Sequence, residues 1–385
     1  MPEHKFFSLV TGPGSHNSLL IRALQTKFSF DYTEYWPRYS HIAAGEKGVK
    51  QLNQSGTFDF ASWLTYGLHN RFGFVSSRRW HHNALFRLYD RINRKNIRGR
   101  NLIAWPQVSY LTMKRIKEKG GMVILEQPMC HVDFWNETSK REHEKLGMED
   151  DLCFSKAMTA RIKKEYELAD QIVALSSFAK GTFVSHGIPE NKIVVHTPGI
   201  NIPPAKERHS NSRLRVLYVG RVEVLKGVIA LMKALAPLSD KVEFHLAGAV
   251  HDSLKKKVAS YQNKFIFHGP VDRNALNGLY QMADVVVFPS LYDSLGLVIL
   301  EAMSYGTPVI ASTHSGGPDI IRDYESGFVL GPTNSDAWIE KIVWMMEHRH
   351  KTAEMGKRAR EHIMQNHSHT HYAKLVTDNV SKTFV

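Results

Sequence analysis

The sequence predicts an α/β protein of two domains built on open parallel sheets, and three observations support this. Apolar runs typical of buried strands alternate with helical stretches along most of the chain. The alternation stops at the polar, proline-containing segment 201–213 and then restarts, which indicates a linker. The chain has 385 residues, of which 43% are hydrophobic and 23% charged, so it is long enough for roughly two or three domains and is not broadly disordered.

In the first half, four apolar runs are expected to be strands. Residues 6–10 lead into a Gly-Pro-Gly turn, after which a helix is expected from Ser18. The runs 122–127 and 171–176 are typical of buried strands, and 192–200 follows a further helix.

In the second half, five strands alternate with helices. The strands are expected at residues 215–220, 242–248, 265–269, 285–290 and 308–312. A helix is predicted from about Gly227 to Leu238, and another ends at Gly306. From Asp336 onward the chain is expected to be helical, with polar breaks near 366–371.

Segments 168–176 and 282–290 resemble each other. Each contains the end of a helix, an Ala-Asp pair, an apolar strand and a serine at the carboxyl edge of that strand, Ser176 or Ser290. Open α/β sheets bind their ligands at this edge. The repeat therefore supports two similar halves and indicates where a ligand would bind.

The charge is positive and unevenly distributed. The chain carries 50 Lys and Arg against 37 Asp and Glu, a net charge of +13. Residues 71–120 contain 13 of the Lys and Arg residues, whereas the acidic residues of this segment are only Asp90 and Glu118. Such a segment either attracts phosphate-rich partners (nucleic acid, anionic lipid or acidic glycan) or is simply a solvated face.

Cysteine content and hydropathy exclude several other classes of protein. The two cysteines, Cys130 and Cys153, cannot form a disulfide framework, and no close Cys/His cluster has zinc spacing. A reducing, cytoplasmic compartment is therefore expected. No apolar run reaches the about 18 residues typical of a membrane span, and the N-terminus is expected to form the first strand rather than a signal peptide.

The strongest functional signal lies in residues 289–321. A strand ends at Ser290, and a helix is expected to begin near Leu297. The loop between them carries Asp293, Ser294 and Gly296. A glycine at a helix start leaves the first N–H groups open to an anion, and Glu301 lies one turn further along the same face. A nucleotide needs both features: donors for its phosphates and an acceptor for its ribose hydroxyls.

A second candidate for phosphate binding follows strand 215–220. Arg221 lies at the carboxyl edge of this strand, and Lys226 comes at the start of the next helix. Two cations that converge on a strand edge can neutralise a departing diphosphate without a metal.

Together these motifs resemble the retaining family-four glycosyltransferases of the GT-B fold. The resemblance rests on Gly-Arg-x(4)-Lys-Gly, Ala-Asp-x(4)-Pro-Ser, an acid-x(7)-Glu-Ala-Met, Gly-x-Pro-Val-Ile-Ala-Ser and Gly-Gly-Pro-Asp-Ile-Ile, in that order over about 213–331. In the first half, Leu125-Glu126 with His131, and the stretch 169–201, look like the N-terminal domain and hinge of that family.

The resemblance implies a fold and a division of labour between the domains. Two Rossmann-like, doubly wound domains would face each other across a cleft. Residues 1–200 would form the acceptor-side domain, joined by a C-terminal helix at about 370–385 that crosses back to it. Residues 205–365 would bind the nucleotide sugar.

The resemblance also implies roles for single residues. Arg221 and Lys226 match the pair that holds the donor diphosphate. Asp293 stands where the family usually has a glutamate that contacts the donor sugar, and Glu301 matches the acid that contacts the ribose. The backbone amides on the phosphates match Gly296 and Leu297, with Ser294 in the same loop. Val271 falls in the loop beside the base, His131 matches a histidine that faces the transferred sugar, and Gly12 and Gly14 stand in the first loop, near donor or acceptor.

For three of these residues another interpretation remains open. Asp293 could cap the following helix, Glu301 could be an acid on a helix surface, and His131 could be a buried structural histidine.

The implied reaction is transfer of a sugar from a nucleotide-diphosphate donor, such as a UDP- or GDP-sugar, to an acceptor hydroxyl with retention of anomeric configuration. The leaving diphosphate helps to deprotonate the acceptor, so neither a dedicated protein base nor a metal or other cofactor is expected. The acceptor is expected to be a glycan or lipid-linked, in synthesis of a polysaccharide, lipopolysaccharide or glycolipid of the cell surface.

The basic segment 71–120 suggests a membrane partner for such an enzyme. Its apolar residues Trp80, Leu85, Phe86, Leu88 and Tyr89 alternate with the cations Arg78, Arg79, Arg87 and Arg91. We therefore expect it to rest on an anionic membrane, peripherally at the inner face. The alternative is a helix whose apolar face packs into the first domain.

Two other functions remain open. One is a sugar-nucleotide epimerase of the GT-B fold, and the other is a basic glycan- or nucleic-acid-binding protein without catalysis. Nucleic acid itself is not an expected partner, because no nucleic-acid-binding module is recognisable.

Overall fold

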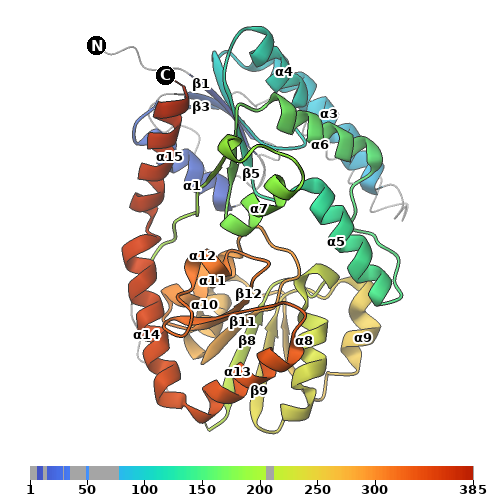
Figure 1. Ribbon diagram of the computed structural model, residues 1–385, viewed down its shortest axis with the longest axis vertical. Coiled ribbons are helices and arrows are strands. Elements are labelled where there is room, and N and C mark those ends of the chain that lie inside the picture. Colours follow the sequence, from blue (N-terminus) through green and yellow to red (C-terminus); the bar gives the residue numbers. More distant parts are fainter. Residues whose placement is uncertain are drawn as a thin grey trace.

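The computed structural model describes most of the chain, and it contains two parallel sheets arranged one above the other along the long axis of the molecule (Figure 1). The described residues are 7–11, 15–28, 30–34, 49–51, 78–204 and 212–384. We call the upper sheet with its helices the first domain, and the lower sheet with its helices the second domain.

The sheet of the first domain has seven parallel strands in the order β3-β2-β1-β4-β5-β6-β7. The strands are β1 (Phe7–Thr11), β2 (Phe30–Glu34), β3 (Val49–Gln51), β4 (Asn101–Ala104), β5 (Val123–Gln127), β6 (Gln171–Ala174) and β7 (Ile193–Val195). The order reverses between β1 and β4, as in doubly wound sheets. Every residue of β5 is buried, because helices cover both faces of a parallel sheet.

Helices of the first domain cover both faces of its sheet. They are α1 (Ser15–Gln25), α3 (Arg78–Asn96), α4 (Tyr110–Glu118), α5 (Val132–Lys145), α6 (Lys156–Leu168), α7 (Ser177–Ser185) and the 3-10 turn η3 (Glu190–Lys192). The last helix of the chain, α15 (His369–Thr383), also packs here, against α1 (Figure 1). Its side chains Tyr372, Val376 and Val380 are buried in a cluster with Phe7 and Leu9 of β1.

The sheet of the second domain has six parallel strands in the order β10-β9-β8-β11-β12-β13. The strands are β8 (Leu214–Val219), β9 (Val242–Ala247), β10 (Ile266–Gly269), β11 (Val285–Phe288), β12 (Val309–Ser312) and β13 (Gly327–Leu330). The helices are α8 (Val228–Leu235), α9 (Lys255–Ala259), α10 (Arg273–Met282), α11 (Leu297–Ser304), α12 (Gly317–Ile320), α13 (Ser335–Glu347) and α14 (Arg349–Asn366), with 3-10 turns η4 (Val224–Lys226), η5 (Ala236–Leu238) and η6 (Asp252–Leu254).

The two Ala-Asp segments occupy equivalent positions in the two sheets. Ala169 and Ala283 each end a helix with nearly the same backbone angles, φ −65° and ψ 137° against φ −68° and ψ 138°. The carboxylate of Asp170 accepts a hydrogen bond from the N–H of Val123 at 2.7 Å, and that of Asp284 from the N–H of Arg215 at 2.8 Å. In both sheets the aspartate therefore fixes the start of a neighbouring strand.

Three strands of the first domain were not expected from the sequence. Strand β2 has the sequence Phe-Asp-Tyr-Thr-Glu, β3 has three residues and β4 has four. None of them forms the longer apolar run by which a buried strand is recognised, because β2 alternates with acids and the other two are short.

Helix α3 carries much of the basic segment, and it packs by its apolar face. Tyr89 is 1% exposed, Phe86 is half-buried, and Leu88 is 37% exposed among outward-facing cations such as Arg87 and Arg91. Tyr89 is therefore not available to a membrane, and the outer face of the described part of α3 is mainly cationic. Residues 71–77 and the side chains of Arg78, Arg79, Trp80 and Leu85 lie outside the described residues. Within the described chain, no helix is both long and apolar enough to cross a bilayer.

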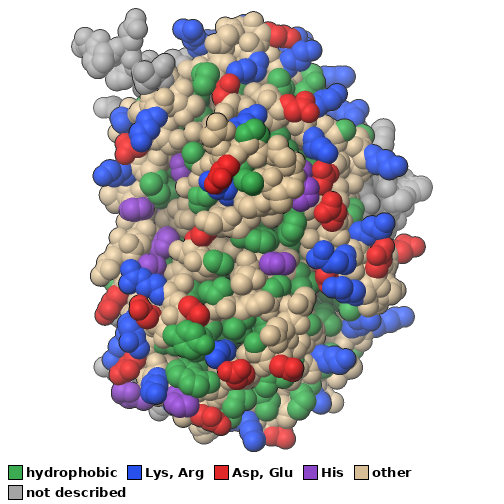
Figure 2. Space-filling model, viewed as in Figure 1, with side chains coloured by type: hydrophobic (Ala, Val, Ile, Leu, Met, Phe, Trp, Pro, Cys, Tyr) green, Lys and Arg blue, Asp and Glu red, His purple; other side chains and the backbone are tan. Residues whose placement is uncertain are grey.

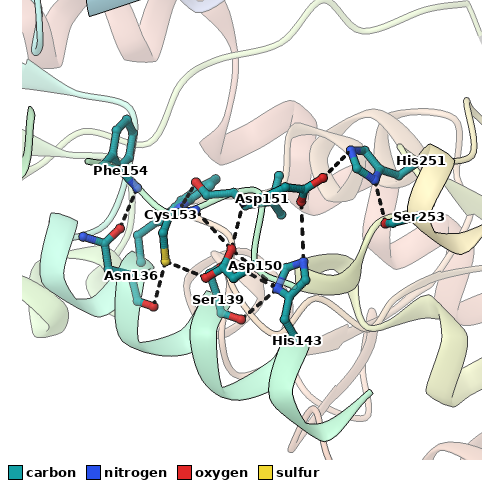
Figure 3. Close-up of polar contacts among 11 residues, drawn as sticks. Asn136, Ser139, His143, Asp150, Asp151, Cys153, Phe154, His251 and Ser253 are labelled. Atoms are coloured by element: carbon teal, nitrogen blue, oxygen red, sulfur yellow. Dashed lines mark hydrogen bonds and ion pairs between the residues drawn. The ribbon is translucent and has the colours of Figure 1, made fainter. Parts of the chain in front are cut away.

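An acidic residue of the first domain bridges the two domains beyond the end of α5 (Figure 3). The carboxylate of Asp151 lies 3.7 Å from Nε2 of His143 on α5 and 3.5 Å from Nε2 of His251, which follows β9 of the second domain. Neighbouring Asp150 holds this segment by accepting hydrogen bonds from Ser139 at 2.8 Å and from the Cys153 thiol at 2.6 Å. The bridge is therefore anchored on a local network of the first domain.

Candidate active site

The carboxyl ends of the two sheets meet, and an ion pair lies at their junction. Nζ of Lys226 is 2.6 Å from Oδ2 of Asp293, and both side chains are largely buried. Lys226 ends the 3-10 turn η4 after β8, and Asp293 lies in the loop between β11 and α11. The sequence predicted both residues for the site, and the structure brings them into contact.

A glycine lets these two segments approach each other. Gly227 has φ 66°, and a Cβ atom there would lie 2.1 Å from the carbonyl oxygen of Pro289. Only glycine tolerates both the left-handed backbone and the close contact. The N–H of Leu291 then donates to the carbonyl oxygen of Leu225 at 2.9 Å, which fixes the spacing of the two loops.

The ion pair keeps Lys226 charged. Burial alone would lower the pKa of Lys226, but the charge and the hydrogen bond of Asp293 outweigh burial and raise this pKa above its ordinary value. A lysine ammonium has three donors, so a phosphate oxygen could be bound beside the Asp293 carboxylate. The second predicted cation, Arg221, is 62% exposed and lies 3.6 Å from the carboxylate of Glu223. Its exposed guanidinium is free to turn toward an anion.

The start of α11 offers hydrogen-bond donors close to Asp293. Gly296 precedes the helix with φ 82°, and a Cβ atom there would lie 2.6 Å from the ring of Phe288. Within the described residues, the N–H groups of Gly296, Leu297 and Val298 have no hydrogen-bond partner. Free N–H groups at a helix start bind anions, as predicted from the sequence for Gly296 and Leu297.

The hydroxyl of Ser294 makes a contact between the domains, and a contact of Ser294 with the donor stays a prediction. Its Oγ donates to the carbonyl oxygen of Pro128 in the first domain at 2.5 Å, and its own carbonyl oxygen accepts from Oγ of Ser176 at 2.5 Å. Ser294 thus joins the domains.

Glu301 lies on α11 and is held by two residues that sequence analysis missed. Its Oε2 accepts a hydrogen bond from the Tyr280 hydroxyl at 2.8 Å, and its Oε1 lies 2.5 Å from Nη1 of Arg273. Arg273 begins α10 two residues after Val271, which is partly buried in the same hydrophobic cluster as α11. The loop predicted to flank the base and the acid predicted to contact the ribose are therefore neighbours.

One signal in the sequence points to Arg273. Aspartate is a preferred residue directly before a helix, so Asp272 marks Arg273 as the first residue of a helix. In the structure Asp272 does cap α10, and its carboxylate accepts the N–H of Ala275 at 2.8 Å. Nothing in the sequence shows which carboxylate this helix start approaches.

His131 is buried at the start of α5. It is 2% exposed, its Nδ1 accepts the N–H of Asp133 at 3.2 Å, and its ring stacks on His186 at 4.5 Å. Burial, together with nearby His186, lowers the pKa of His131 to about 4. At neutral pH the ring is therefore uncharged, and the proton is on Nε2 because Nδ1 is an acceptor. A structural role as helix cap is thus present, while contact with a sugar stays a prediction.

The remaining predictions concern the first loop and metals. Gly12 and Gly14 lie outside the described residues. Within the described parts of the chain, no three His, Cys, Asp or Glu side chains are grouped so that they could hold a metal ion.

Comparisons with known proteins find similarity to glycosyltransferases. Residues 201–362 match the family model described as Glycosyl transferases group 1. The chain is 30% identical over 240 residues to an uncharacterized glycosyltransferase of Methanocaldococcus jannaschii, a match that covers 57% of this chain and 60% of that protein. It is 27% identical over 223 residues to the sulfoquinovosyl transferase SQD2 of Arabidopsis thaliana, covering 54% of this chain and 43% of that protein. The chain thus spans about half the length of these curated relatives.

A solved structure is similar over nearly the whole chain. HepE of Anabaena, in complex with UDP-glucose, matches with a TM-score of 0.66 and 15% identity, covering 98% of this chain and all of that one. This likeness, with the two parallel α/β domains, confirms the predicted GT-B fold.

Proposed function

We propose that this chain is a glycosyltransferase that moves a sugar from a nucleotide-diphosphate donor to an acceptor hydroxyl, with retention of configuration at the anomeric carbon. The observation that carries the proposal is the Lys226–Asp293 pair beside the free N–H groups at the start of α11. The match of residues 201–362 to the glycosyltransferase family model supports it independently.

In the proposed mechanism, the bond between the anomeric carbon and the diphosphate oxygen breaks first. Negative charge then develops on the leaving diphosphate, and Lys226, Arg221 and the amides of α11 stabilise it. The acceptor hydroxyl attacks from the face that the diphosphate leaves, and its proton passes to a diphosphate oxygen. Asp293 orients the donor sugar by accepting its hydroxyl hydrogens.

The nucleoside would lie beside α10 and α11. Glu301 accepts the ribose hydroxyls, and Val271 borders the base. Because Glu301 already binds Arg273 and Tyr280, both of its oxygens are held in fixed positions before the donor arrives. A uridine nucleotide is the first donor to test, since HepE was solved with UDP-glucose.

We extend the proposal to the acceptor. Exposed cations on α3, on α4 and directly after α4 include Arg87, Arg91, Arg94, Lys95, Lys114 and Lys119. Lys and Arg side chains are numerous on the same upper region of the surface (Figure 2). Such a surface suits an anionic membrane, and hence a glycan or lipid-linked acceptor in cell-surface glycan synthesis on the cytoplasmic side.

A thermal-shift screen tests the nucleotide site. UDP, GDP, ADP and CMP, each with and without a sugar, are added to the protein and to the variant Lys226→Ala. One nucleotide series should raise the melting temperature of the wild-type protein, because a ligand that binds only the folded state stabilises it, and should raise that of the variant much less. No shift with any nucleotide would contradict the proposal.

A further inference from the structure

Two residues that belong to the second domain by sequence are buried in the hydrophobic core of the first domain. Leu225 is 1% exposed and Tyr292 is 4% exposed, and both join a cluster made otherwise of first-domain residues. The ring of Tyr292 meets that of Trp135 on α5 edge-on, with centroids 4.6 Å apart. Its phenol oxygen accepts the backbone N–H of Cys130 at 2.9 Å.

Each of these residues immediately precedes one half of the candidate ion pair. Leu225 comes before Lys226, and Tyr292 comes before Asp293. Within their loop, Tyr292 and Ser294 contact the first domain, while Asp293 between them contacts Lys226 of its own domain.

The two segments are also joined to each other by their backbones. The carbonyl oxygen of Leu225 accepts the N–H of Tyr292 at 3.3 Å. Asp293 is fixed further by its N–H, which donates to the carbonyl oxygen of His314 at 3.0 Å, and by Oδ1, which accepts the N–H of Leu295 at 3.1 Å. A displacement of Leu225 or Tyr292 would therefore move Lys226 and Asp293.

We propose that Leu225 and Tyr292 are positioning residues, whose burial in the first domain sets the separation and orientation of Lys226 and Asp293. The inference rests on the function proposed above for that pair. It adds that the sugar-transfer geometry is assembled from both domains, although both charged side chains belong to the second. When the two domains separate, the pair loses this constraint, while Glu301 and Val271 keep their places on the second domain.

The variants Tyr292→Phe and Leu225→Ala test this inference. The first removes only the phenol oxygen, and the second shortens a buried side chain. The matched controls are Tyr261→Phe and Leu254→Ala, which make the same changes within the second domain's own cluster. Three measurements are made on the full chain. The release of UDP from UDP-glucose gives kcat and KM, a binding experiment gives the Kd of UDP, and hydrogen exchange is followed at the Leu295 amide.

Both test variants should lower kcat by about 10- to 100-fold, the scale of a small misplacement in an active site. The Kd of UDP and KM should change much less than kcat, because Glu301 and Val271 keep their places. Exchange at the Leu295 amide should be faster than in wild type, and both controls should behave like wild type. Unchanged kcat and exchange in the test variants would overturn the inference, as would a loss of UDP affinity as large as the loss of kcat. If wild type releases no UDP from UDP-glucose, the exchange comparison alone decides the inference, whereas the nucleotide screen decides the proposed function.

Discussion

The carboxylate of Glu301 lies between the hydroxyl of Tyr280 and the guanidinium of Arg273, and the Glu301–Tyr280 hydrogen bond of 2.8 Å joins the last turn of α10 to α11. The two acids of the candidate site therefore have different partners, because Asp293 is bound to Lys226 instead. This difference predicts that the acids can be separated experimentally.

Replacing Glu301 with glutamine should weaken the binding of plain nucleotide for two reasons. The amide nitrogen cannot accept a hydrogen bond from the ribose hydroxyls, and the neutral side chain no longer attracts the Arg273 guanidinium. Replacing Asp293 with asparagine should leave nucleotide affinity nearly intact and lower the rate of sugar transfer. Isothermal calorimetry with nucleotide, together with turnover of the nucleotide sugar, checks both changes. If Asp293→Asn weakened nucleotide binding and Glu301→Gln mainly slowed sugar transfer, Asp293 would contact the nucleoside and Glu301 the sugar, which would contradict the assignment.

Removing either cation should lower turnover by about 10²- to 10³-fold, the scale for losing one charge-stabilising group. The two variants should differ in stability. Arg221→Ala changes an exposed side chain and should leave the free energy of unfolding unchanged, whereas Lys226→Ala leaves the largely buried Asp293 without its partner and should destabilise the fold. Urea denaturation measures this difference, and a Lys226→Ala, Asp293→Asn double variant should recover part of the lost stability. Near-normal turnover in both single variants would remove the cations from the site.

The neutral state of buried His131 predicts a pH dependence of stability. The pKa of His131 is about 4 in the folded chain, whereas the ordinary value for a histidine, which applies to the unfolded chain, is 6.5. Between these values the unfolded chain binds more protons than the folded one, so stability falls as the pH decreases from about 6.5 to about 4. At pH 5 this contribution is about 2 kcal/mol.

The variant His131→Asn isolates this contribution, since asparagine can still cap α5. Urea denaturation at pH 7 and pH 5 should show a smaller loss of stability in the variant than in wild type. Other buried histidines, such as His367 with a pKa of about 4, are present in both proteins and cancel in the comparison. Equal losses in the two proteins would contradict the buried, uncharged state of His131.

The cationic face of α3 predicts binding to anionic vesicles at low salt, with little binding to neutral ones. Each cation near the surface adds about 1 kcal/mol, so the double variant Arg87→Glu, Arg91→Glu should bind several-fold less. The control changes Lys256 and Lys257, which are exposed on α9 of the second domain, to glutamate. Co-sedimentation measures the bound fraction. Equal binding to both lipids, or none, would exclude the membrane surface and leave the transferase proposal untouched.

Much of the second domain could be predicted from sequence because its motifs mark where elements begin and end. The Ala-Asp pair before β11 and Ser290 after it enclose the strand that the structure places at Val285–Phe288. The segments of Lys226 and Asp293 could be assigned to the candidate site because ligands bind at the carboxyl edge of an open sheet, but the contact between the two side chains was not expected.

Other features depend on packing that no local pattern contains. Arg273 and Tyr280 reach Glu301 because α10 lies beside α11, and this depends on the shape of the whole core. Likewise the amphipathic pattern of α3 reveals an apolar face but not what covers it, which proved to be the core of the first domain around Tyr89. Leu225 and Tyr292 look like core residues of their own domain until both domains are seen together.

The proposed transfer reaction is tested most directly by ³¹P and ¹H NMR of the protein incubated with the nucleotide sugar that the thermal-shift screen selects. The account predicts that free nucleoside diphosphate accumulates, and that the first sugar product, formed with an added acceptor or with water, keeps the anomeric configuration of the donor. Arg221→Ala should slow this release by about 10²- to 10³-fold. An epimerised nucleotide sugar, or a nucleotide sugar left intact although it binds, would contradict the account.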